Sequence, residues 1–205
     1  MLTAFTAGLL LITVSELGDK TFFIGVILAM RYSRKLVFIG VGGALAAMTI
    51  LSVIFGRVVS FLPEIYLKYG EIVLFLGFGI KLLYEASKMP ESGSEIEVIN
   101  EAKEAVYKAD LQRKSKSPLA IFIEAFTLTF IAEWGDRTQI ATIALAARYN
   151  PVGVAAGAVL GHIICTAIAV IGGKLIAGRI SERQLSFIGG CLFLIFGILA
   201  AIQGL

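Results

Sequence analysis

Long stretches without charge dominate the pattern of hydrophobic and polar positions along this 205-residue chain. Leu36–Gly56 and Gln184–Leu205 contain no acidic or basic residue, and the only one in Tyr149–Gly173 is His162. About 20 consecutive apolar residues cross the hydrocarbon core of a bilayer. Hydrophobic residues make up 58% of the whole chain, which is high for a soluble domain of this length. The pattern therefore predicts an all-α polytopic membrane protein.

Six transmembrane helices account for the apolar stretches. The N-terminal stretch lacks the basic start and the small-residue cleavage site of a signal peptide, so we predict that it is retained as a helix. The third stretch is the shortest and is flanked by Glu71 and Lys81. The predicted helices cover residues 3–30, 36–59, 70–88, 118–147, 151–174 and 185–204.

A charged segment, residues 89–117, separates the third predicted helix from the fourth. A run of charges of this kind is most often a solvated loop. Its apolar residues nevertheless recur at helical spacing, which would allow an amphipathic helix on the membrane surface. They are Ile96, Ile99, Ala102, Val106 and Ala109.

The sequence repeats itself after 117 residues. SELGDKT at 15–21 matches AEWGDRT at 132–138, and the agreement continues from Leu28 and Leu145 to Gly56 and Gly173. Internal self-similarity of this kind indicates a duplicated structural unit. We predict a first three-helix repeat at 1–88, a charged cytoplasmic linker at 89–117 and a second three-helix repeat at 118–205.

Lysine and arginine residues are concentrated in every second loop between the predicted helices. Cytoplasmic loops carry an excess of these residues, so the loops after the first, third and fifth helices should be cytoplasmic and both termini non-cytoplasmic. Because each repeat has three helices, the two repeats then insert with opposite polarity. Inverted repeats are an architecture of secondary transporters, which bind their substrate near the bilayer midplane.

Each repeat carries two acids in the middle of a predicted membrane helix. Glu16 and Asp19 are three residues apart, which on a continuous helix places them on one face, and Glu133 and Asp136 have the same spacing. A charge at the centre of a span costs roughly 3 kcal/mol on insertion scales. These side chains must therefore face the protein interior. We expect the inverted symmetry to bring the four carboxylates to one site.

A purely structural interpretation pairs each glutamate with the basic residue four positions later. Glu16 would pair with Lys20 and Glu133 with Arg137. This interpretation leaves both aspartates without a cationic partner, and it gives no reason for the same cluster in both repeats.

Four converging carboxylates suit a hard divalent cation, since Ca²⁺, Mg²⁺ and Mn²⁺ prefer oxygen ligands. Crowded carboxylates also disfavour one another's charged form, so an empty site should hold protons that the metal displaces. That is the minimal device for cation/proton exchange. Neutral oxygens are available nearby on five predicted secondary ligands: Thr21, Thr138, Gln139, Thr49 and Thr166.

Four further residues of the predicted spans have roles that stay open. Lys20 and Arg137 are candidates for charge balance or gating, because their own charge excludes them as metal ligands. A single histidine in a helix is most often a packed, hydrogen-bonded residue. The position of His162 is also compatible with an imidazole ligand that favours Mn²⁺ over Ca²⁺, or with a proton relay. Gly18, with its counterpart in the second motif, permits either close helix approach or a local break that frees backbone carbonyls.

The duplicated E-x-G-D-[KR]-[ST] motif resembles the calcium/manganese:proton antiporters of Golgi, chloroplast and bacterial membranes. FTLTFIAEWGDRTQIATIALAARY and GHIICTAIAVIGGKLIAGRIS look like the second half of that family, and SELGDKTFFIGVILAMRYSRK looks like its first half. The chain is most similar to the manganese-exporting members from cyanobacteria. The resemblance implies Mn²⁺ or Ca²⁺ as the transported ion, export from the cytoplasm, and a plasma or thylakoid membrane. It also implies cation binding by Glu16, Asp19, Glu133 and Asp136.

Two other functions compete with the antiporter. A divalent cation channel with an acidic filter would use the same carboxylates. An intramembrane aspartyl protease is disfavoured, because neither aspartate follows a G-x-G sequence. We therefore expect a transporter rather than an enzyme, with no cofactor and no nucleic acid partner, and homo-oligomer formation stays open.

Overall fold

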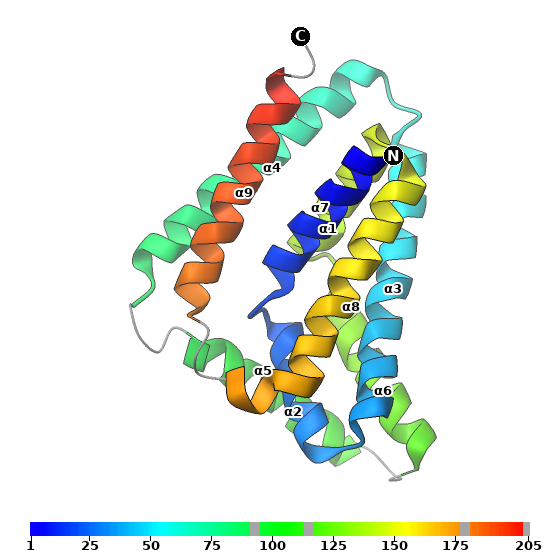
Figure 1. Ribbon diagram of the computed structural model, residues 1–205, viewed down its shortest axis with the longest axis vertical. Coiled ribbons are helices and arrows are strands. Elements are labelled where there is room, and N and C mark those ends of the chain that lie inside the picture. Colours follow the sequence, from blue (N-terminus) through cyan, green and yellow to red (C-terminus); the bar gives the residue numbers. More distant parts are fainter. Residues whose placement is uncertain (91–94, 113–116, 177–180, 203–205) are drawn as a thin grey trace.

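The computed structural model describes residues 1–90, 95–112, 117–176 and 181–202 of the chain. Over these ranges it consists of nine α-helices and contains no β-strand (Figure 1). They are α1 (Leu2–Glu16), α2 (Lys20–Arg31), α3 (Arg34–Val59), α4 (Glu64–Lys88), α5 (Glu95–Gln112), α6 (Pro118–Ala132), α7 (Arg137–Arg148), α8 (Pro151–Ile176) and α9 (Glu182–Ile202). The prediction of an all-α protein is confirmed for this part of the chain.

Two predicted spans are not continuous helices. The predicted helix 3–30 is broken between α1 and α2, and 118–147 is broken between α6 and α7, whose axes differ by 73°. The cause is a left-handed glycine in each break, Gly18 with φ 79° and Gly135 with φ 81°. Glycine adopts this conformation without the steric cost that a side chain brings. The expectation that the two acids of each motif share one helix face is therefore wrong.

Three helices are long and apolar enough to cross a membrane by themselves: Arg34–Val59, Pro151–Gly172 and Glu182–Ile202. The pair α6 and α7 provides a fourth span if the two pieces are counted as one. Helix α1 is apolar but has only 15 residues, fewer than the 20 or so that a bilayer requires. These helices identify a multi-pass membrane protein, while the count of six spans stays a prediction.

Close contacts between helix backbones hold α1 against α8. A Cβ atom added at Gly157 of α8 would lie 2.1 Å from the carbonyl oxygen of Phe5 in α1. One added at Gly8 of α1 would lie 2.9 Å from the carbonyl oxygen of Val154. Small residues allow this approach, which is how helices commonly pack in membranes. The contacts fix the position of the end of α1, which carries Glu16.

The charged segment after α4 contains a helix that packs on the protein. Helix α5 lies across the end of the molecule where α2 also lies (Figure 1), and its Ala102 and Val106 are fully buried in a cluster with residues of α2 and α3. Lys20 of α2 pairs with Glu101 at 3.1 Å. The expectation of a solvated loop is therefore wrong for residues 95–112. They form a helix whose apolar side chains pack against α2 and are not exposed to water.

The two repeats make corresponding polar contacts at the ends of α2 and α7. The Arg-Tyr pair at 31–32 binds Asp110 of α5, with the tyrosine hydroxyl donating at 2.6 Å and the guanidinium at 3.5 Å. The Arg-Tyr pair at 148–149 contacts Glu71 of α4, again through both the guanidinium and the hydroxyl. Each broken helix thus ends by binding a carboxylate from a different segment.

Candidate metal-binding site

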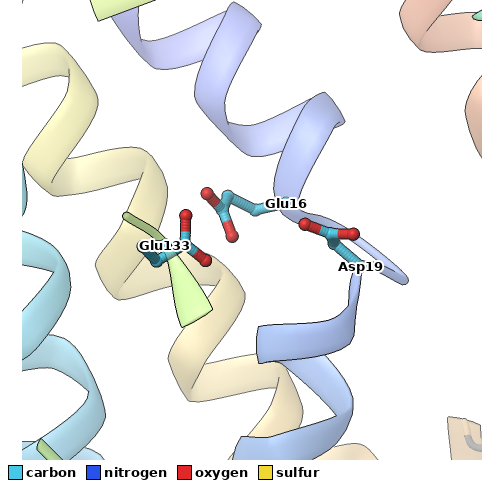
Figure 2. Close-up of side chains that lie close together, drawn as sticks. All are labelled: Glu16, Asp19 and Glu133. Atoms are coloured by element: carbon cyan, nitrogen blue, oxygen red, sulfur yellow. The ribbon is translucent and has the colours of Figure 1, made fainter. Parts of the chain in front are cut away.

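Three of the four motif acids lie close together. Glu16, Asp19 and Glu133 each place one carboxylate oxygen within 4.8 Å of the others. Figure 2 shows the carboxylates of Glu16 and Glu133 next to each other, with Asp19 on the turn that follows Glu16. The side chains of Glu16 and Glu133 are only 2% exposed, and that of Asp19 is 27% exposed. The expected meeting of the two motifs is thus present for these three acids.

The fourth acid, Asp136, lies outside this cluster. Its side chain caps α7 by accepting hydrogen bonds from the backbone N–H of Thr138 at 3.3 Å and from the hydroxyl of Thr138 at 3.0 Å. The structure therefore brings together three carboxylates where the sequence analysis expected four.

The two helix breaks contain the same backbone hydrogen bond. The carbonyl of Glu16 accepts from the N–H of Asp19 at 3.2 Å, and that of Glu133 accepts from the N–H of Asp136 at 3.1 Å. Helices α1 and α6 both end at these glutamates, and a helix C-terminus carries partial negative charge. Helices α2 and α7 begin at the same breaks, so each break places a helix C-terminus and a helix N-terminus, of opposite partial charge, beside the acids.

Gly135 serves the break by its conformation. A Cβ atom added there would meet nothing within 4 Å, so close helix approach is not the reason for this glycine. Its positive φ is the requirement, as the alternative of a local break predicted.

A threonine binds the glutamate of each motif. The hydroxyl of Thr21 donates to Oε2 of Glu16 at 3.3 Å, and that of Thr138 shares its single proton between Oε2 of Glu133 at 3.4 Å and the carboxylate of Asp136 at 3.0 Å. Oε1 of each glutamate is buried and has no hydrogen-bond partner among the described residues. The threonines therefore hold one oxygen of each glutamate and leave the other available to a ligand.

The other predicted oxygen donors lie near the glutamates but make local bonds. Gln139 accepts from the backbone N–H of Gly135 at 2.7 Å, which supports the second break. Thr49 donates to the carbonyl of Leu45, and Thr166 donates to the carbonyl of His162. Hydroxyls in helices commonly bond in this way to the preceding turn.

The basic residues of the motifs do not pair as the structural interpretation proposed. Arg137 lies 3.7 Å from Asp19 of the other repeat and donates to the carbonyl of Ser15 at 3.3 Å. Lys20 turns away from the cluster to Glu101. The structural interpretation would have left Asp19 without a cationic partner, but Asp19 has one, which comes from the other repeat. This arrangement also makes the two halves asymmetric, since only Arg137 reaches the acids.

Cavities adjoin all three acids of the cluster, and Glu16 lines one of about 10 Å³ together with Thr166. A cavity of about 70 Å³ lies between the break after α1 and the adjoining ends of α4 and α9, with Asp19, Arg137, Glu85 and Glu182 in its lining. A second cavity, of about 10 Å³, adjoins Glu133 and lies between α3, α7 and α8. The second has room for about one water molecule.

Two acids of the larger cavity were not anticipated from the sequence. Glu85 lies near the end of α4 and Glu182 begins α9, so both resemble ordinary charged residues at the ends of membrane helices. The salt bridge between Glu71 and Arg148 was also missed, although it is buried. An ionisable residue inside a predicted span was the available signal for Glu71.

Comparison with known proteins identifies the family. The sequence profile described as divalent cation/proton antiporter GDT1 matches residues 4–90 and 121–205. The chain belongs to this family. Members of the GDT1 family are transporters and not enzymes, which confirms that part of the sequence analysis.

Individual relatives in the GDT1 family cover nearly the whole chain. A GDT1-like protein of Synechocystis sp. is 57% identical over 98% of this chain and 97% of its own length. The chloroplastic PAM71-homolog of Arabidopsis thaliana is 43% identical over 95% of this chain and 58% of its own length. GDT1-like protein 3 of Oryza sativa is 46% identical, and the match covers 95% of this chain and 72% of that protein. No solved structure matches the chain.

Proposed function

We propose that this chain exchanges Mn²⁺, or alternatively Ca²⁺, for protons and moves the metal out of the cytoplasm. The transported ion is bound by Glu16, Asp19 and Glu133 at the two helix breaks. Asp136 is the fourth ligand once it releases Thr138. The observation that carries the proposal is the meeting of carboxylates from both repeats within 4.8 Å.

The donor set suits a hard divalent cation. Ligand atoms about 2.0–2.6 Å from one cation lie at most about 5 Å apart, which the carboxylate oxygens satisfy. Six or more oxygens are needed around Ca²⁺, and Mn²⁺ also accepts carboxylate, carbonyl and water oxygens. Neutral hydroxyls next to the acids, from Thr21 and Thr138, supply further donors.

Proton coupling follows from the crowding of the acids. Three charged carboxylates this close, two of them almost without solvent, carry more negative charge than the single guanidinium of Arg137 beside Asp19 balances. The empty site therefore holds protons, and a divalent cation replaces them when it binds. Exchange of one for the other needs no additional group.

Access from one side at a time distinguishes an antiporter from a channel. The 70 Å³ cavity approaches Asp19 from the end of the molecule where α5 lies, which the distribution of Lys and Arg assigns to the cytoplasm. The cavity beside Glu133 is about 10 Å³, much smaller than its counterpart. This difference supports a cytoplasm-facing state of a transporter with alternating access, with both chain termini on the other side.

The inverted repeat gives this cycle its symmetry. Residues 1–88 and 118–205 form the two three-helix repeats, joined by the cytoplasmic linker 89–117, and each places a broken helix against the other. Figure 1 shows α1 and α2 running in the direction opposite to α6 and α7. Rocking of one repeat against the other would move access from one face to the other. The membrane is the plasma or thylakoid membrane.

Transport by purified protein in vesicles tests the proposal. Mn²⁺ uptake should depend on a pH gradient, and Mn²⁺ should in turn move protons. Glu16→Gln should abolish both, because it removes one charge from the cluster. Asp136→Asn should do the same if this acid joins the site during the cycle.

A matched control removes an exposed acid far along the sequence from the motifs. Glu64→Gln at the start of α4 should leave the exchange unchanged. Unchanged flux in Glu16→Gln would refute the site assignment. Wild-type flux that neither drives nor follows a pH gradient would instead indicate a channel.

A further inference from the structure

Three unpartnered buried atoms gather beside the helix breaks. They are Oε1 of Glu16, Oε1 of Glu133 and Nδ1 of His162, and none has a hydrogen-bond partner among the described residues. The residues that carry these atoms are at most 5% exposed. Buried polar atoms in proteins are nearly always hydrogen-bonded, so a group of unbonded ones indicates a ligand that the chain itself does not supply.

His162 lies beside Glu16 but outside the group of three acids whose oxygens lie within 4.8 Å of one another. Its Nδ1 lies 3.5 Å from Oε1 of Glu16 without forming a hydrogen bond to it. Two ligands that bind one cation at right angles, each at about 2.0–2.6 Å, are about 2.8–3.7 Å apart. His162 also lines the small cavity beside Glu133, so its side chain is near both glutamates.

The helix that carries His162 is held firmly in place. Helix α8 packs against α1 through the contacts at Gly157 and Gly8, and α1 ends at Glu16. The hydroxyl of Thr166 donates to the carbonyl of His162 one turn later. The distance between the imidazole and Glu16 is therefore set by rigid packing, as a ligand pair requires.

We propose that Nδ1 of His162 is a direct ligand of the transported metal ion, and that this nitrogen makes the site selective for a divalent transition metal over Ca²⁺ and Mg²⁺. Ca²⁺ takes oxygen ligands almost exclusively, whereas imidazole binds transition metals. The inference rests on the proposed function, and between the two ions proposed there it favours Mn²⁺ over Ca²⁺. Only one repeat supplies the nitrogen, because the residue that matches His162 in the first repeat is Leu45.

Electron spin-echo spectroscopy of bound Mn²⁺ tests this assignment on the wild-type protein. A coordinated imidazole modulates the echo at nitrogen frequencies, and His162 is the only histidine in the chain. Protein purified without a histidine tag should show ¹⁴N modulation that changes to the ¹⁵N pattern when only histidine is isotope-labelled. Bound Mn²⁺ without histidine modulation would overturn the inference and leave the carboxylate site standing. Absence of Mn²⁺ binding and transport would overturn both.

Selectivity gives the second measurement. His162→Asn places an amide oxygen near the position of Nδ1, so it should weaken Mn²⁺ binding at least about tenfold, since even partners of ligands contribute about 10–100-fold to affinity. Ca²⁺ competition should change by less than about threefold, because Ca²⁺ accepts the oxygen. Cys165→Ala is the matched control on the same helix, beside Glu16 but bonded to the carbonyl of Thr13, and it should leave the ratio unchanged. An equal loss for both ions in His162→Asn would indicate a structural role and refute the inference.

Discussion

The break between α6 and α7 depends on the left-handed conformation of Gly135, and this dependence can be tested by substitution. Gly135 has φ 81°, and a Cβ atom added there meets nothing within 4 Å. The methyl group of an alanine therefore clashes with no neighbouring residue. The only cost is that alanine must adopt the left-handed backbone conformation. Gly135→Ala consequently isolates the cost of the conformation.

The magnitude follows from a matched alanine elsewhere. A left-handed conformation costs an L-residue roughly 1–2 kcal/mol. A Cβ atom added at Gly42 in α3 also meets nothing within 4 Å. Gly42 is in a helix, where alanine is favoured over glycine by roughly 0.5–1 kcal/mol, so Gly42→Ala should be stabilising. The two alanine variants should therefore differ by about 1.5–3 kcal/mol in the free energy of unfolding. For a chain of this length that is a difference of about 3–12 °C in melting temperature.

Thermal unfolding in one detergent, together with Mn²⁺ transport in vesicles, measures both consequences. Gly135→Ala should lose transport beyond its loss of stability, because Glu133 and Asp136 flank the altered residue. Gly135→Asn should recover part of both, since asparagine enters the left-handed region several-fold more readily than other residues. Equal melting temperatures for the two alanine variants, or no advantage of asparagine over alanine, would refute the conformational explanation.

Three further substitutions test the packing around the site. Gly157→Ala places a Cβ atom 2.1 Å from a backbone oxygen of α1, so it should lower the melting temperature and weaken Mn²⁺ binding together; a stable variant with normal binding would contradict that contact. Exchanging the charges of Lys20 and Glu101 should restore what each single reversal loses, with a coupling of at most about 1 kcal/mol in a double-mutant cycle because both side chains are 41–55% exposed. Glu71→Gln should destabilise the protein by about 3–5 kcal/mol in denaturant unfolding, since Arg148 stays buried and loses its partner; a loss below about 1 kcal/mol would show that the pair is solvated.

The sequence by itself determined the class of protein and the origin of its site. Uncharged stretches of more than 20 residues require a bilayer, and the 117-residue repeat identifies which acids belong together. The sequence predicts that Glu16 and Glu133 share one site, because charged groups inside a membrane span must find partners, and the structure places them together. These inferences depend on composition and spacing, which a linear sequence contains in full.

Only the tertiary structure decided how the site is built. The position of Gly135 in the motif does not determine its backbone conformation. The sequence therefore allowed either a close approach of two helices or a break in one helix at this glycine. The partner of Asp19 comes from the other repeat and that of Lys20 from α5, and such contacts depend on how helices pack. Packing of α8 against α1 likewise places His162 beside Glu16, 146 residues earlier in the chain. Matching motifs therefore acquire different surroundings, because α5 packs against α2 and because matched neighbouring positions carry different residues, such as Leu45 and His162.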